Sequence, residues 1–156
     1  MLVSTLTAEM RTHIGTPFHN GGRVSGPNGG IDCGGLLAVS LRNLGYEVVD
    51  IPNFNPKSDS IELMTEVLID NNFINQGLPL LSEDRIFLPG NVAIVRGLRM
   101  NHHMVYFSTG TQLYATPNII HAYNSSGINK VVEMPMPQSW IENIHSIWRL
   151  EGLEEG

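Results

Sequence analysis

The sequence predicts an α+β domain, with helices in its first half and an antiparallel sheet in its second half. Before Asn71, apolar residues recur three and four positions apart, which is the spacing of helices that bury one face. Beyond Pro89-Gly90 the pattern changes to short runs rich in β-branched and aromatic residues, separated by turn residues. Helices followed by strands are typical of the α+β class, and 156 residues suffice for one domain with a buried core. We therefore expect a single domain over residues 1–156.

The first predicted elements are two helices joined by a loop. The helix over 1–14 follows from apolar residues spaced four positions apart, at Leu2, Leu6, Met10 and Ile14. Turn signals such as Asn20-Gly21-Gly22 predict a loop over 16–30. The next helix begins at Cys33 and ends at Gly45, because its apolar positions share one face: Cys33, Leu36, Leu37, Ser40, Leu41 and Leu44.

The sequence in the middle of the chain predicts one more helix, which lies between two irregular segments. Residues 48–55 form a short extended piece that Pro56 closes. An amphipathic helix follows from Ile61 to Leu68, capped by Ser58 or Asp59. The polar residues 71–84 are typical of a surface loop.

The second half predicts a sheet closed by a short helix. The expected strands cover 92–96, 103–108, 112–115, 119–123 and 130–134. A helix at 138–144 and a last strand at 147–150 complete the domain, before an acidic tail at 151–156. We expect Trp140 and Trp148 to pack in the core.

Charge and hydropathy exclude several classes of partner. The net charge of −6 leaves no basic stripe, so we expect no nucleic acid as partner. No run approaches the roughly 18 apolar residues of a membrane span, so we expect no membrane insertion. The first residues lack the basic start and continuous apolar core of a secretory signal, which predicts synthesis in the cytoplasm without a signal peptide.

Cys33 is the only cysteine and stands where a glycine-rich loop meets a predicted helix. A thiol at a helix N-terminus lies in the partial positive charge of the helix dipole, which lowers the pKa of the thiol and favours the reactive thiolate. The structural alternative is a buried cysteine that acts as a small hydrophobe. A nucleophilic cysteine also needs a base, so histidines elsewhere in the chain decide between the two.

Two of the six histidines fall on predicted strands. Alternation puts His103 on one face with Val105 and Phe107, and His121 on one face with Ile119 and Tyr123. If these faces meet over the start of the Cys33 helix, a Cys-His-His relay forms. The remaining histidines fit ordinary positions: His102 in solvent or a loop, His13 and His145 on the surface, and His19 along a cleft.

Metal and phosphate chemistry are the alternatives for these residues. Cys33, His102, His103 and His121 could in principle bind a metal, but the chain has no close ligand pair such as Cys-x-x-Cys. The glycine pairs lack the lysine of a phosphate-binding loop. We therefore expect no metal and no cofactor.

Five ordered blocks of residues resemble the NlpC-type cell-wall cysteine peptidases, most closely the small members encoded with bacteriophage and gene-transfer-agent tail genes. These blocks are Gly15-Thr16-Pro17-Phe18-His19-Asn20-Gly21-Gly22, Asp32-Cys33-Gly34-Gly35-Leu36-Leu37, Pro89-Gly90-Asn91-Val92, His103-Met104-Val105-Tyr106 and Ile120-His121-Ala122-Tyr123. The resemblance implies a papain-like fold, hydrolysis of peptide bonds in peptidoglycan stem peptides, and no cofactor.

The resemblance also implies residue roles. Cys33 is the nucleophile, His103 the general base and acid, and His121 the group that orients His103. The remaining residues that it places at the substrate site are Phe18, His19, Asp32 and Gly34, with Asp32 shaping the site rather than catalysing. The chain departs from the family pattern at Phe18, where many relatives have tyrosine, at Asn91, where aspartate is common, and at Val105, where a small residue is usual.

The sequence thus predicts a peptidoglycan endopeptidase that works through thiolate attack and an acyl-enzyme. The resemblance also implies a place at a phage tail tip, with tail-hub or tail-tip proteins as partners and the bacterial wall as the place of action. Two alternatives stay open. One is a structural or assembly tail protein that keeps the peptidase fold with little activity, and the other is an amidase or acyl-transfer reaction on another amide.

Overall fold

The computed structural model describes residues 1–50, 61–77, 87–96, 102–110, 116–125 and 127–156. The helices are α1 (Val3–Arg11), α2 (Cys33–Asn43), α3 (Ile61–Asp70) and α4 (Gln138–Ile141). The strands are β1 (Arg23–Val24), β2 (Gly30–Ile31), β3 (Phe73–Asn75), β4 (Val92–Arg96), β5 (His102–Phe107), β6 (Asn118–Ser125), β7 (Ile128–Pro135) and β8 (Ile144–Leu150).

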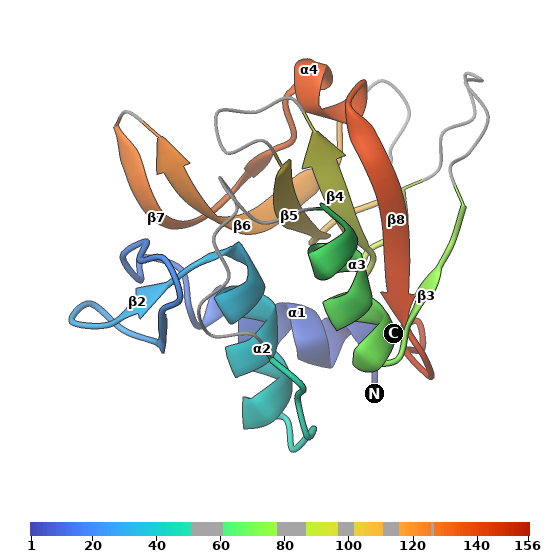
Figure 1. Cartoon of the computed structure of the whole chain (residues 1–156), viewed down its shortest axis with the longest axis horizontal. Helices are drawn as coiled ribbons and strands as arrows, with labels where there is room; N and C mark the ends of the chain where they lie inside the picture. The colour runs from blue at the N-terminus through green and yellow to red at the C-terminus, as the bar shows by residue number, and fades with distance from the viewer. Residues whose placement is uncertain (51–60, 78–86, 97–101, 111–115, 126) are drawn as a thin grey trace.

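Within the described residues, one six-stranded antiparallel sheet forms the centre of the fold, in the order β3-β8-β4-β5-β6-β7 (Figure 1). A small hairpin of β1 and β2 lies beside the start of α2. The predicted α+β class, with early helices packed on a later antiparallel sheet, is therefore confirmed.

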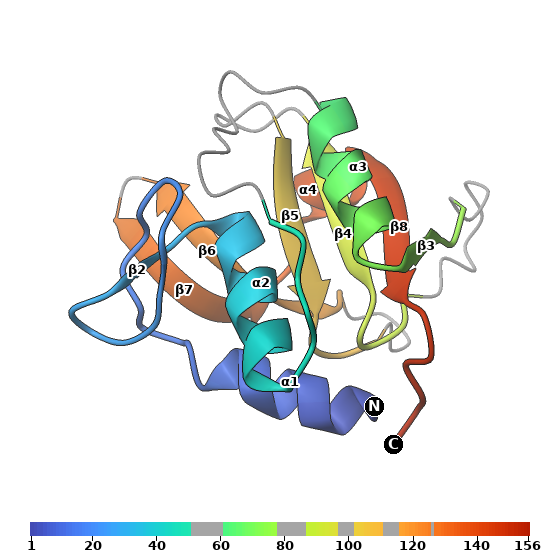
Figure 2. The same ribbon diagram turned by 60° about the horizontal axis from the view of Figure 1, so that its bottom comes forward.

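The helices cover opposite faces of this sheet. Figure 2 shows α2 and α3 in front of the sheet and α4 behind it. The front, which we call the helix face, carries strand residues that pack in one cluster with α1, α2 and α3: Val92, Ile94, Met104, Tyr106, Ile120 and Ala122. The back, which we call the α4 face, carries those that pack with Trp140 and Ile141: Ala93, Val95, Val105, Phe107 and Ile119. The two clusters follow the alternation of side chains along β4, β5 and β6.

Capping and a glycine explain the bounds of α2. The Asp32 side chain accepts a hydrogen bond from the Gly35 amide at 2.7 Å, which satisfies one of the free amides of the first turn. Gly45, at φ +93°, follows the end of the helix, where a left-handed residue is common. The helix predicted from Cys33 to Gly45 is confirmed, with its buried face as expected.

The two ends of the chain lie side by side below the sheet (Figures 1 and 2). The Val3 amide donates to the Glu154 carbonyl at 2.8 Å, and the Glu154 amide donates to the Met1 carbonyl at 2.9 Å. The acidic tail therefore pairs with the start of α1, and Leu153 is buried.

Two predicted loops contain short strands. The 16–30 loop includes β1 and β2, and the 71–84 loop includes β3, which pairs with the edge of β8. Strands of two or three residues are too short for alternation to reveal them. The expected caps Ser58 and Asp59 and the strand at 112–115 lie outside the described residues.

The remaining elements agree with the prediction within a few residues. Strand β4 has the predicted bounds, β5 begins one residue earlier, and α4 ends at Ile141. Trp140 and Trp148 are both buried, as predicted. Among the described residues, no helix is long and apolar enough to span a membrane.

Candidate active site

Cys33 is the first residue of α2, and its side chain is only 3 % exposed. It packs on the helix face, where it shares a small pocket with Met104 and Tyr106 of β5 and Ile120 of β6. The backbone of Met104 lies close enough to the thiol to favour its charged form. The candidate nucleophile therefore faces β5 from the helix side of the sheet.

Burial, together with the neighbouring Asp32 carboxylate, raises the pKa of the Cys33 thiol to about 12. The backbone of Met104 and of Gly34 and the Arg23 guanidinium act in the opposite direction without outweighing burial. The lowered pKa expected from the helix N-terminus is therefore wrong for this state, because desolvation exceeds the helix dipole. A thiolate at neutral pH would require a base close to the sulfur.

His103 and His121 meet in a buried pair. His103 Nε2 and His121 Nδ1 are 2.7 Å apart, and neither side chain is exposed. The rings of Tyr123 and Trp140 pack against both histidines, with centroids 5.1 to 5.8 Å apart. Since Trp140 belongs to α4, this pair lies on the α4 face.

The structure therefore corrects the predicted Cys-His-His relay. His103 and His121 share a face, as alternation predicted, but this face lies across the sheet from Cys33. The reason is the alternation of side chains along β5. His103 shares the α4 face with Val105 and Phe107, whereas Met104 and Tyr106 face α2. The sheet backbone separates the thiol from the His103 ring.

His102 stands on the Cys33 side instead. It is the first residue of β5, is 6 % exposed, and by alternation shares the helix face with Met104. The predicted place in solvent or a loop is therefore wrong. Two residues along a strand span about 7 Å, so an imidazole at His102 is within side-chain reach of a thiol above Met104. His102 is therefore the candidate base for the Cys33 thiol.

The buried histidine pair predicts a pH-dependent stability. Burial lowers the pKa of His103 well below 6.5 and that of His121 to about 4, so both rings bind protons more readily in the unfolded chain. Their contribution to stability is fully present above about pH 6.5 and is lost as the pH falls towards 4. The His121 shift alone corresponds to about 3 kcal/mol.

Denaturant unfolding between about pH 7.5 and pH 5 measures this loss. His121→Asn is expected to flatten the profile, while His19→Gln, at an exposed position, leaves it unchanged. A free energy of unfolding that stays constant across this range contradicts the prediction.

Asp32 is fully buried, and its carboxylate is hydrogen-bonded to the glycine loop and to the start of α2. Its carboxylate accepts from the Gly21 amide at 2.8 Å, the Gly35 amide at 2.7 Å and the Arg23 guanidinium at 2.8 Å. With no exposed surface, the Asp32 side chain is not placed to contact a substrate directly. The expectation that it shapes the site agrees with these contacts, since Asp32 joins the glycine loop to the start of α2.

The other predicted substrate residues surround the start of α2 to different degrees. Phe18 is half-buried, bridges to Ile31 and packs against the core cluster that contains Cys33. Gly34 is partly exposed and lines a cavity beside Met104. His19 is exposed, and its Nδ1 lies 2.9 Å from the Asn20 carbonyl. The structure thus brings Phe18 and Gly34 to the site and leaves His19 at its outer edge.

The cavity beside Gly34 lies between α2, α3 and the sheet, and its enclosed space of about 40 Å³ is small. Its walls are mostly apolar, from Leu37, Leu41, Met64 and Phe73. Arg23 and Asp50 form its charged side, where they pair with each other at 2.6 Å.

The two glycines after Cys33 differ in what surrounds them, which predicts opposite effects of alanine. A Cβ on Gly35 would lie 2.3 Å from the Gly22 carbonyl oxygen, whereas one on Gly34 meets nothing closer than 3.7 Å. Gly35→Ala is expected to destabilise the fold by about 1–3 kcal/mol, because the glycine loop must move away from α2.

Gly34→Ala is the matched control, and it is expected to be neutral or to stabilise the helix by up to about 1 kcal/mol. Thermal unfolding of the two variants measures the difference. Equal midpoints for Gly35→Ala and Gly34→Ala would contradict the close approach of the loop.

His13 is buried rather than on the surface, and it joins α1 to the glycine loop. Its Nδ1 lies 2.6 Å from Ser25 Oγ and its Nε2 lies 3.0 Å from Glu9 Oε1. A serine, a histidine and a carboxylate in series could suggest a second nucleophile. However, the adjacent Gly26 amide donates to the Thr16 hydroxyl at 3.0 Å and is not available to an oxyanion. We assign this set to holding the loop.

Arg23 and Asp50 were not predicted from the sequence, and the sequence placed His102 in solvent or a loop rather than at the site. Either of two adjacent histidines could face Cys33, and a single strand does not reveal which one does. Arg23 and Asp50 belong to no recognisable motif, and they meet only in the folded chain. His145, predicted on the surface, is half-buried beside Ser146. In the part of the chain that the structure describes, no cluster of histidine, cysteine and carboxylate groups could hold a metal ion.

Comparison with solved structures supports an NlpC/P60-like α+β fold for the chain. The solved P60 domain of an antigen from M. avium subspecies paratuberculosis is similar, with a TM-score of 0.54 and 17 % identity over 95 % of this chain and 93 % of that domain. The structure of Ly7917 has a TM-score of 0.50 and 11 % identity, and the chain spans 62 % of it. No family model and no curated protein matches the sequence. These likenesses establish the fold.

Proposed function

We propose that the chain is a cysteine hydrolase of peptide bonds in peptidoglycan, with Cys33 as nucleophile and His102 as general base. The observation that carries the proposal is the position of Cys33 at the first turn of α2, facing the strand that begins with His102. The NlpC/P60-like fold supports the same chemistry, and the sequence resemblance to cell-wall peptidases supports the substrate.

The proposed reaction begins with transfer of the Cys33 proton to His102, because the buried thiol is protonated at neutral pH. The thiolate then attacks the substrate carbonyl carbon to form a tetrahedral oxyanion. The Cys33 amide at the α2 N-terminus supports this oxyanion, since the Asp32 side chain accepts instead from the Gly35 amide. His102 returns the proton to the leaving amine, and water hydrolyses the remaining thioester.

Mass spectrometry of fragments released from purified peptidoglycan tests this proposal. The wild-type chain and Cys33→Ala are incubated side by side with the same wall preparations. New peptide termini that appear only with the wild-type chain would support the hydrolase and identify the bond that is cleaved. A folded wild-type chain that releases nothing from several wall types would contradict it.

A second candidate is a structural or assembly tail protein that keeps the peptidase fold with little activity. The buried thiol, and a histidine pair that faces away from it, favour this candidate. A place at a phage tail tip is common to both candidates and rests on the sequence resemblance. Affinity for tail-hub proteins without any wall cleavage would favour the second candidate, while absence from purified particles would count against the tail setting of both.

A further inference from the structure

We propose that Arg23 is a positioning residue for the Cys33 nucleophile: it fixes the Asp32 cap of α2 and offsets the negative charge of Asp32 beside the thiol. This inference rests on the proposed function only in taking Cys33 as the nucleophile. It adds a residue from the glycine loop to a site that otherwise consists of α2 and β5.

Arg23 lies at the centre of a network that links three segments. Its Nη1 donates to Asp32 Oδ1 at 2.8 Å and to the Gly22 carbonyl at 2.7 Å. Its Nε and Nη2 donate to the two carboxylate oxygens of Asp50 at 2.6 and 3.1 Å. Because the guanidinium is planar, it can make both sets of bonds only in this orientation. The loop, the helix cap and residue 50 are therefore held together by one side chain.

The charge of Arg23 matters because the cap of α2 is itself an anion. A carboxylate is a good N-cap, yet here it is adjacent in sequence to the thiol that must ionise. Asp32 opposes ionisation of Cys33, and Arg23 favours it. The other titratable groups that alternation places on this side of β5 are His102 and Tyr106. An uncompensated Asp32 would leave the thiol facing a buried negative charge.

The side chain of Arg23 is only 14 % exposed, so solvent screens this interaction weakly. Burial works against the charge of Arg23, but Asp50 and Asp32 outweigh it, and the pKa of the guanidinium is raised. Asp50 therefore holds the Arg23 guanidinium directed at the cap, although the two carboxylates are 27 and 9 residues away in sequence.

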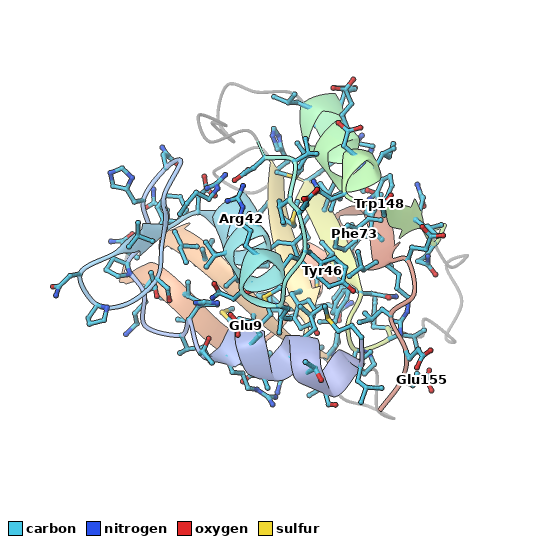
Figure 3. The ribbon with its side chains drawn as sticks, turned by 90° about the horizontal axis from the view of Figure 1, so that it is seen from below. Glu9, Arg42, Tyr46, Phe73, Trp148 and Glu155 are labelled. Atoms are coloured by element: carbon cyan, nitrogen blue, oxygen red, sulfur yellow. The ribbon has the colours of Figure 1, made fainter. Side chains whose placement is uncertain are left out.

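Arg42 provides a matched control from the same surroundings. Its side chain extends from the last turn of α2, where Figure 3 labels it, and is 44 % exposed. It donates to Asp50 at 3.5 Å and to the Val48 carbonyl at 3.5 Å, rather than to Asp32. Arg42→Met thus removes one positive charge next to Asp50 without touching the cap.

The test is the rate at which iodoacetamide alkylates the full chain as a function of pH. Cys33 is the only cysteine, so every adduct reports on this thiol. Arg23→Met is expected to slow alkylation at a given pH by about tenfold, which is one unit in the pKa of the thiol. Arg42→Met is expected to react at the wild-type rate. Arg23→Lys keeps the positive charge but loses the planar set of N–H donors. Its alkylation rate is expected to fall between those of Arg23→Met and Arg42→Met.

Circular dichroism confirms that each variant is folded, and Arg23→Lys serves as the test if Arg23→Met does not fold. Alkylation of the folded Arg23 variants at the wild-type rate or faster would overturn the inference. No wall substrate is involved, so this result is separate from the test of the proposed function. A chain that cleaves no peptidoglycan can still show the effect of Arg23 on its thiol.

Discussion

Replacing His102 with alanine is expected to lower kcat/KM for peptide cleavage by about 10²–10⁴-fold, the usual contribution of a general base. His102 shares the helix face of β5 with Met104, whose backbone lies next to the Cys33 thiol. Since burial raises the pKa of this thiol to about 12, the reaction depends strongly on a neighbouring base. Steady-state kinetics on a stem peptide measure the effect.

His103→Ala is the informative comparison because the two histidines are adjacent in sequence and face opposite ways. The His103 ring packs against Trp140 on the α4 face, so its loss is expected to reduce thermal stability. At a temperature where this variant is folded, kcat/KM should stay within a few-fold of wild type. A large loss in His103→Ala with normal rates in His102→Ala would reverse our assignment and restore the predicted relay.

Cys33→Ala is expected to abolish cleavage, with a loss of at least about 10³-fold. Alanine removes only the sulfur from a side chain that is 3 % exposed, so the fold should persist. Fragment release from peptidoglycan, measured together with the thermal midpoint, separates loss of chemistry from loss of structure. Cleavage by Cys33→Ala at the wild-type rate would exclude Cys33 as the nucleophile.

Much of the fold could be predicted from periodicity. The helix from Cys33 follows from its single apolar face and from Asp32 and Gly45 at its ends, and β4 has the predicted bounds. Strands β1, β2 and β3 could not be predicted, since two or three residues are too few to show the alternation that is typical of a strand. Strands β1 and β2 pair with each other across the glycine loop, and β3 forms because β8, distant in sequence, supplies its hydrogen bonds.

The candidate site was harder to predict because it depends on which face of the sheet meets α2. Alternation correctly grouped His103 with His121, since both hold fixed positions on neighbouring strands. It could not show that Met104 rather than Val105 faces Cys33, because both faces of β5 are buried and apolar. The raised pKa of Cys33 also depends on burial, which no local motif contains.

The most direct test of the central claim is the mass of the protein in an acid-quenched reaction with a stem peptide. We expect an acyl adduct on the peptide that contains Cys33, and accumulation of this adduct if water attack is the slower step. The adduct should be absent from Cys33→Ala. An adduct on another residue, such as Ser25 beside His13, would contradict the assignment of Cys33 as the nucleophile, as would cleavage in Cys33→Ala.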